Sequence, residues 1–125
     1  MRASRVSLPM LFVVLAAACS GEGPVYRPGT MTATLVGPNG AEGAALVVLV
    51  GDGVGEVSAV APTELFVGMG DGSVRLVLVN REGGDLSFRV AVADVTQPPS
   101  AVVQQVAGPD DELRAVGDYQ VVFAR

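Results

Sequence analysis

Apolar and polar residues alternate along several short stretches of this chain, a pattern typical of half-buried β-strands. The clearest alternation covers residues 86–92, where Leu86, Phe88, Val90 and Val92 are apolar and the residues between them are polar or small. Glycine-rich turns separate the stretches, and no segment keeps a helical apolar period over ten residues. The expected strands are 30–36, 44–50, 54–60, 64–69, 73–80, 86–92, 101–107 and 119–124.

Three of these stretches carry more specific expectations. Residues 44–50 are apolar on both faces and rich in valine, which predicts a central strand. Residues 101–107 fit either a strand or two turns of helix, and we favour a strand that forms a hairpin with 119–124. Turns are expected at Asn39-Gly40, Gly51-Asp52-Gly53, Gly70-Asp71-Gly72, 80–84 and 109–112.

Seven or eight short strands spaced by roughly 8 to 12 residues predict an all-β fold, an antiparallel β-sandwich formed by one domain over residues 30–125. The pattern resembles immunoglobulin-like and cohesin-like modules of bacterial surfaces. Paired cysteines and a core tryptophan are absent, and Gly117-Asp118-Tyr119 resembles a tyrosine corner. The resemblance implies an architecture and assigns no binding residues.

The first 18 residues have the organisation of a signal peptide. Arg2 and Arg5 supply the positive start, residues 8–18 form an apolar run of eleven, and three alanines precede Cys19. An apolar helix of eleven residues is too short for a bilayer core of about 30 Å, which needs about 20. We therefore expect cleavage rather than a membrane span.

The end of this leader, Leu15-Ala16-Ala17-Ala18-Cys19, resembles the lipobox of bacterial lipoproteins, with Ala16 where leucine is usual. Cys19 is the single cysteine of the chain, and an unpaired thiol at the start of an exported protein is explained if a lipid is attached to it. The resemblance implies acylation of Cys19 and, with Ser20 in place of aspartate, outer-membrane residence where the host has two membranes. Residues 19–29 would form the lipidated cysteine and a flexible tether. The alternatives are simple secretion after cleavage at Ala18, an unmodified thiol on a disordered N-terminus, and an uncleaved anchor.

Composition then narrows the function. The net charge of −5 becomes −7 once Arg2 and Arg5 are removed with the leader, so nucleic acid is a poor partner. The chain has no histidine and no lysine, and Cys19 lies outside the folded domain. Catalytic triads, Cys-His pairs, lysine nucleophiles and His/Cys zinc sites are therefore excluded. We expect a protein that is not an enzyme and that needs no cofactor.

Acidic side chains are the remaining candidates for chemistry. Asp52 and Asp71 lie in matching Gly-Asp-Gly turns and with Glu56 could supply oxygen ligands to Ca²⁺. Turn chemistry alone also accounts for both triplets, so we expect no metal and keep Asp52 and Asp71 as weak candidates. The acidic cluster 110–112 is likewise either a calcium-binding loop or an ordinary bend. Glycoside cleavage by paired carboxylates would have to use Asp52, Glu56, Glu64 or Asp71.

The sequence thus predicts a cell-envelope lipoprotein whose domain is a non-catalytic protein-interaction or structural module. Its expected partners are the membrane, through the lipid anchor, and another envelope protein. The alternatives are a domain that binds carbohydrate or a small apolar molecule, and a calcium-dependent adhesion domain. Carbohydrate sites usually offer flat aromatic faces, and the chain offers few candidates, namely Tyr26, Phe66, Phe88, Tyr119 and Phe123.

Overall fold

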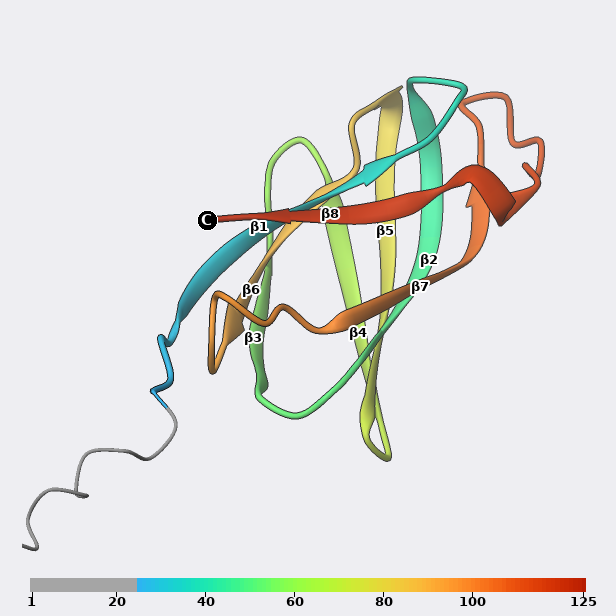
Figure 1. The fold of residues 1–125 in the computed structure, drawn as a ribbon. Helices are drawn as coiled ribbons and strands as arrows, with labels where there is room; N and C mark the ends of the chain where they lie inside the picture. The colour runs from blue at the N-terminus through green and yellow to red at the C-terminus, as the bar shows by residue number, and fades with distance from the viewer. Residues whose placement is uncertain (1–24) are drawn as a thin grey trace, which may run out of the picture.

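The computed structural model describes residues 25–125 and shows two antiparallel four-stranded sheets packed face to face (Figure 1). The predicted all-β sandwich of seven or eight strands is confirmed. The predicted signal peptide, Cys19 and the first part of the predicted tether lie outside the described residues. The strands are β1 (Gly29–Val36), β2 (Glu42–Val50), β3 (Val54–Ala59), β4 (Glu64–Gly70), β5 (Ser73–Gly84), β6 (Ser87–Val92), β7 (Ser100–Ala107) and β8 (Gln120–Ala124).

The first sheet has the strand order β3-β6-β1-β8, and the second has the order β4-β5-β2-β7. β2 and β5 are the central strands of the second sheet, and for β2 this confirms the prediction made from residues 44–50. β4 and β7 are its two edges. Because the chain alternates between the sheets, most neighbouring strands are distant in sequence.

The core lies between the sheets and is filled by alternate residues of each strand. Phe88 and Val90 on β6 are fully buried, as are Val47 on β2 and both Leu76 and Leu78 on β5. For Phe88 and Val90, the alternation over residues 86–92 predicts this inward orientation. The remaining buried apolar residues are Met31, Ala33, Leu35, Ala45, Leu49, Val74, Leu86, Val92, Val106 and Tyr119.

Two local predictions are wrong. The favoured strand over 101–107 is confirmed as β7, but the predicted hairpin with 119–124 is wrong, because β7 pairs with β2 while β8 pairs with β1 in the other sheet. Residues 80–84 continue β5 instead of forming a turn, because Glu42 of β2 pairs with Gly84 and extends the sheet. The buried Asn80 side chain supports this end of β5, where its Oδ1 accepts the Glu82 N–H (3.1 Å).

The residues just before β1 are held against the domain. The Val95 N–H donates to the carbonyl of Arg27 (2.8 Å), so the last part of the predicted tether is attached to the loop after β6. In that loop Asp94 Oδ1 accepts from the hydroxyl and the N–H of Thr96 (2.6 and 2.9 Å), and these bonds lower the pKa of Asp94. Within residues 25–125, no helix is long and apolar enough to cross a membrane.

Candidate functional site

The outward surface of the second sheet is mostly apolar, whereas that of the first sheet is mostly polar. On the first sheet threonines of β1 lie beside Ser87 and Arg89 of β6, and Thr34 and Ser87 share a hydrogen bond of 3.0 Å. A sheet with one solvated face ordinarily alternates apolar inward and polar outward residues. The second sheet departs from this rule, and we call its outward-pointing apolar side chains the apolar face: Ala44, Leu46, Val48, Val50, Phe66, Val77, Val79, Val102 and Ala107.

Several members of the apolar face are substantially exposed. Phe66 is 56% exposed, Val102 50%, Val50 44% and Val77 37%. Phe66 lies directly opposite Val77, which lies opposite Leu46, so their side chains form one row across three strands. Contiguous apolar patches on a domain surface mark interaction sites more often than single exposed residues do.

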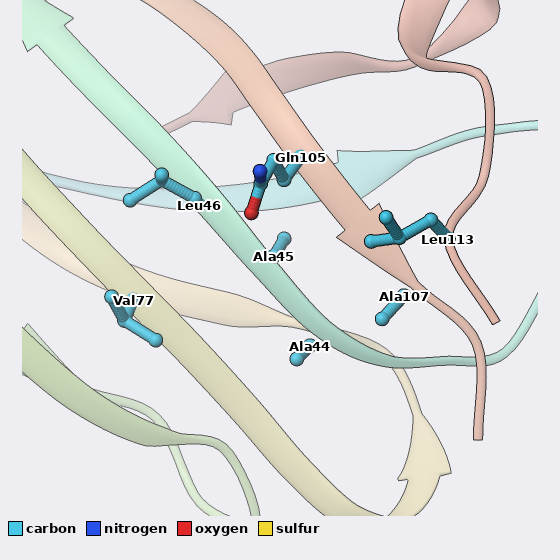
Figure 2. A pocket seen from close by; sticks show the side chains of 7 residues that line it. All are labelled: Ala44, Ala45, Leu46, Val77, Gln105, Ala107 and Leu113. Atoms are coloured by element: carbon cyan, nitrogen blue, oxygen red, sulfur yellow. The ribbon is translucent and has the colours of Figure 1, made fainter. Parts of the chain in front are cut away.

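A shallow hollow of about 180 Å³ lies at one end of the apolar face. Figure 2 shows Leu46 and Val77 on one side of it and Ala107 and Leu113 on the other. Leu113, in the loop after β7, is 73% exposed and forms an isolated bridge with Ala107. The hollow has no ionisable lining residue, and Gln105 supplies its one polar side chain.

Charged groups lie on the same side of this sheet, with Arg75 opposite Val48 and Glu64 opposite Val79. The Arg81 guanidinium donates to Glu64 (Nε to Oε2, 2.5 Å), and this hydrogen bond raises the pKa of Arg81. Both side chains are well exposed, so the pair adds little stability. Of the carboxylates considered for glycoside cleavage, Glu64 is therefore already paired with a cation.

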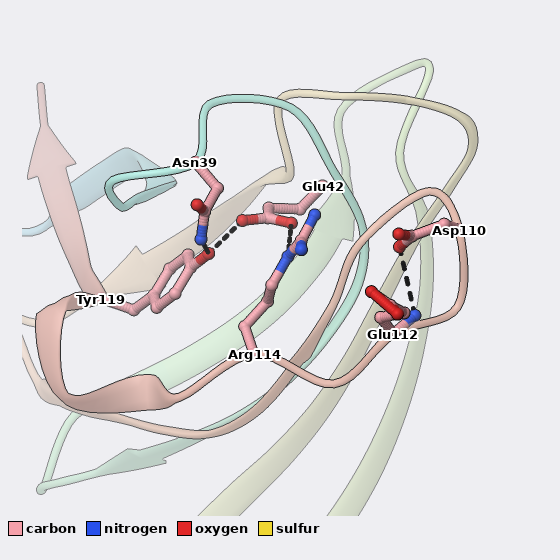
Figure 3. Close-up of polar contacts among 6 residues, drawn as sticks. All are labelled: Asn39, Glu42, Asp110, Glu112, Arg114 and Tyr119. Atoms are coloured by element: carbon pink, nitrogen blue, oxygen red, sulfur yellow. Dashed lines mark hydrogen bonds and ion pairs between the residues drawn. The ribbon is translucent and has the colours of Figure 1, made fainter.

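A polar cluster lies at the end of the sandwich where β2 begins, and the sequence pattern did not reveal it (Figure 3). The Glu42 carboxylate is 2% exposed and accepts hydrogen bonds from the Tyr119 hydroxyl and from Arg114 Nε, the latter at 3.2 Å. Asn39 Nδ2 donates to the same Tyr119 hydroxyl (2.7 Å). The Glu42 bond raises the pKa of Arg114. The carboxylate is thus fully engaged by protein groups, which favours a structural role.

Glu42 is buried because of a β-bulge. The register of β2 against β5 shifts between Glu42 and Ala44, so the strict alternation along β2 fails at this point. By alternation Glu42 would face outward with Ala44 and Leu46. The one available signal is that Glu42 is the single charged residue between Arg27 and Asp52.

Tyr119 connects this cluster to the core. It follows a short 3₁₀ helix, Val116–Asp118, and is 8% exposed. A Cβ at Gly37 would overlap its ring, so glycine is required there for the close approach. Its hydroxyl bonds side chains of the β1–β2 region, whereas a tyrosine corner bonds a nearby upstream backbone group. The resemblance to that motif therefore does not extend to its hydrogen bond.

The Tyr119 environment predicts a loss of stability at alkaline pH. Burial, followed by the bond to Glu42, raises the pKa of Tyr119 above its ordinary 10.0. The folded state therefore binds the Tyr119 proton more tightly than the unfolded state does. The resulting contribution to the free energy of unfolding is complete below pH 10 and disappears as the pH rises through the folded-state pKa. We expect the free energy of unfolding to decline above about pH 10 and Tyr119→Phe to reduce that decline. Tyrosinate absorbance in a Tyr26→Phe background, where Tyr119 is the remaining tyrosine, measures the pKa directly.

The Gly-Asp-Gly turns lie at one end of the sandwich. A hollow of about 260 Å³ is lined by Asp52 and by Gly70 and Gly72, but Asp71 does not line it. Gly53 and Gly72 have φ of 83° and 71°, which accounts for glycine in each triplet. The cluster 110–112 forms a bend and not a helix, with the Glu112 N–H donating to Asp110 Oδ1 (3.2 Å).

Across residues 25–125, no three or more acidic, histidine or cysteine side chains come together as a metal site. The expected aromatic positions divide between core and surface: Phe88 is fully buried, Phe123 packs against the core, and Phe66 is on the apolar face. Cys19, the predicted acylation site, lies outside the described residues.

Comparisons of the chain with protein-family models, curated proteins and solved structures found no match.

Proposed function

We propose that this chain is a cell-envelope lipoprotein, anchored through Cys19, whose sandwich is a non-catalytic protein-interaction module. The apolar face of the second sheet is the docking surface for an envelope protein that presents a complementary apolar patch. The observation that carries this proposal is the contrast between the two sheets: threonine, serine and arginine predominate outside the first, whereas valine, leucine and phenylalanine predominate outside the second, where the charged residues include Arg75 and Glu64.

The physical argument is the cost of leaving that face in water. Covering apolar surface contributes about 25 cal/mol per Å². The centre of a protein interface is depleted of charge and enriched in aromatic residues, and the row formed by Phe66, Val77 and Leu46 has this composition. Glu64 and Arg81 would lie at the polar rim of such an interface, whereas Arg75 lies within the face, opposite Val48.

The distribution of ionisable groups supports a non-catalytic role. Glu42 is the most buried carboxylate of the described domain, and it is engaged by Arg114 and Tyr119. It has no free path to a substrate. Asp52 and Asp71 occupy turns whose glycines explain the local sequence, and Asp94 caps its own loop.

The lipid anchor predicts a labelling result. In a bacterial host the chain should incorporate labelled fatty acid and fractionate with membranes, because several acyl chains at about 0.8 kcal/mol per buried methylene hold a protein permanently. Cys19→Ser should lose both the label and the membrane fraction. A wild-type protein that is soluble, with Cys19 present as a free thiol, contradicts the anchor.

The docking surface predicts position-specific crosslinking. A photoreactive residue at Val77, on the apolar face, should capture a defined protein in living cells, and Leu46→Asp should abolish that capture by placing a charge in the interface. Val122 is a matched control, since it is a valine 45% exposed on the outward side of the first sheet. Equal capture of the same protein from both positions would contradict docking at the apolar face.

A further inference from the structure

Strand β4 is an edge strand, and its residues from Phe66 to Gly70 are exposed to solvent. Phe66, Val67 and Met69 are 56%, 47% and 79% exposed, and the segment 65–70 carries no charge. An exposed apolar edge is a template for pairing with another strand, and proteins usually protect such edges with charges, proline, bulges or a covering segment. β4 has none of these between Leu65 and Gly70.

The other three edges are each protected. β3 contains a register shift between Val54 and Val57. β7 carries an irregularity opposite Leu46 and Val47, and its end is covered where the Arg114 N–H donates to the Val106 carbonyl (2.8 Å). β8 is only five residues long. β4, by contrast, pairs with β5 without interruption over all seven of its residues.

The hairpin geometry shows which backbone groups of β4 are available. Gly70 and Ser73 pair across the two-residue turn Asp71-Gly72, so they form the hydrogen-bonded pair that closes the hairpin. Hydrogen-bonded and non-hydrogen-bonded pairs alternate along an antiparallel ladder. Phe66 and Gly68 therefore direct their N–H and C=O groups toward β5, and Leu65, Val67 and Met69 direct theirs toward the open edge.

We propose that the occupant of this edge is a second copy of the chain, paired antiparallel with β4 about a two-fold axis at Val67. In this register Val67 faces Val67 of the second copy, and Leu65 faces Met69. The backbone N–H and C=O groups of these residues point toward the open edge of β4, so each of these pairs exchanges two backbone hydrogen bonds.

The side chains fit this register on both faces. Phe66 lies opposite Gly68 of the second copy, where the ring covers a position that has no side chain, an arrangement that stabilises glycine in sheets. On the other face Val67 and the Leu65–Met69 pairs place apolar groups together. Glu64 lies opposite Gly70 and remains paired with Arg81 of its own copy, so no like charges face each other directly.

Pairing through β4 joins the two second sheets into one continuous sheet. Directly opposite residues lie on the same side of an antiparallel pair, so the two apolar faces lie on the same side of the joined sheet. The inference goes beyond the proposed function, because it concerns the edge of the sheet and holds whether or not another protein covers the face.

A charge exchange at the two-fold axis tests the proposal. The full-length chain, extracted in detergent, should sediment as a dimer. Val67→Lys and Val67→Glu should each be monomeric, because identical charges then face each other across the axis. An equal mixture of the two variants should recover a mixed dimer, which only contact of position 67 with itself explains. Circular dichroism identifies either variant that fails to fold.

Disulfide formation gives an independent measurement that does not depend on these variants. Val67→Cys should form an intermolecular disulfide under oxidation, while wild type, with Cys19 alone, and the matched edge variant Val122→Cys should not. A monomeric wild type, a dimer that survives Val67→Lys, or equal crosslinking at position 122 would overturn the proposal. None of these results changes the expected photocrosslinking of a partner protein from position Val77. The proposal of docking at the apolar face is therefore tested independently of the dimer.

Discussion

Replacing Phe88 by alanine is expected to lower the free energy of unfolding by about 3 to 5 kcal/mol, the range for truncating a buried aromatic side chain. Phe88 is fully buried on β6 and pairs with Ala33 of β1 and with Ala59 of β3. Because small residues flank the ring on both neighbouring strands, neither neighbour can fill the space that alanine leaves. Urea denaturation followed by circular dichroism measures the change.

Arg89 is the matched control for this experiment. It is the next residue of the same strand, exposed on the outward side of the first sheet. Arg89→Ala should change the free energy of unfolding by no more than about 0.5 kcal/mol, as surface substitutions usually do. Similar losses for both variants would show that β6 does not present Phe88 to a packed core.

The sequence predicts the strands and the core well because strand periodicity reports directly on burial. Phe88 and Val90 alternate with polar or small residues in the sequence, and both are buried as expected. At a β-bulge, where one strand contains an extra residue, alternation no longer predicts which side chains are buried. The bulge beside Glu42 reverses the face on which that side chain lies, and no pattern in the sequence marks the bulge.

Strand pairing was harder to predict than strand existence. β7 and β8 follow each other in the chain and suit a hairpin by sequence, yet each pairs with a strand far away, β2 and β1 respectively. The hydrogen-bonding pattern of a strand does not identify its partner. That choice depends on which pairing buries the most apolar surface in the whole domain.

The apolar face was visible in the sequence but was ambiguous. Valine and leucine on both faces of 44–50 predict a central strand, and β2 is central. A strand that is apolar on both sides can be covered on both sides within its own domain, or can leave one side for a partner. The two cases have the same sequence pattern, and only the exposure of Val77 and Phe66 separates them.

The second large effect is expected at Glu42. Removing one partner of a buried ion pair costs about 3 to 5 kcal/mol when it leaves the other charge uncompensated. Glu42→Ala should fall near the lower limit of this range, because the Arg114 side chain is 25% exposed and can recruit water. The Tyr119 hydroxyl, which is more deeply buried, loses its acceptor entirely.

Glu42→Gln separates charge from packing at this position. The amide has nearly the same volume, and its oxygen can accept from either Tyr119 or Arg114, so the loss should be smaller, about 1.5 to 3 kcal/mol for a hydrogen bond to a charged group. A double-mutant cycle that combines Glu42→Ala with Tyr119→Phe should show a clear coupling energy, since the two side chains are in direct contact. Additive losses would mean that the Tyr119 hydroxyl contributes to stability without Glu42. A free energy of unfolding unchanged by Glu42→Ala would show that the desolvation of the carboxylate cancels everything gained from its partners.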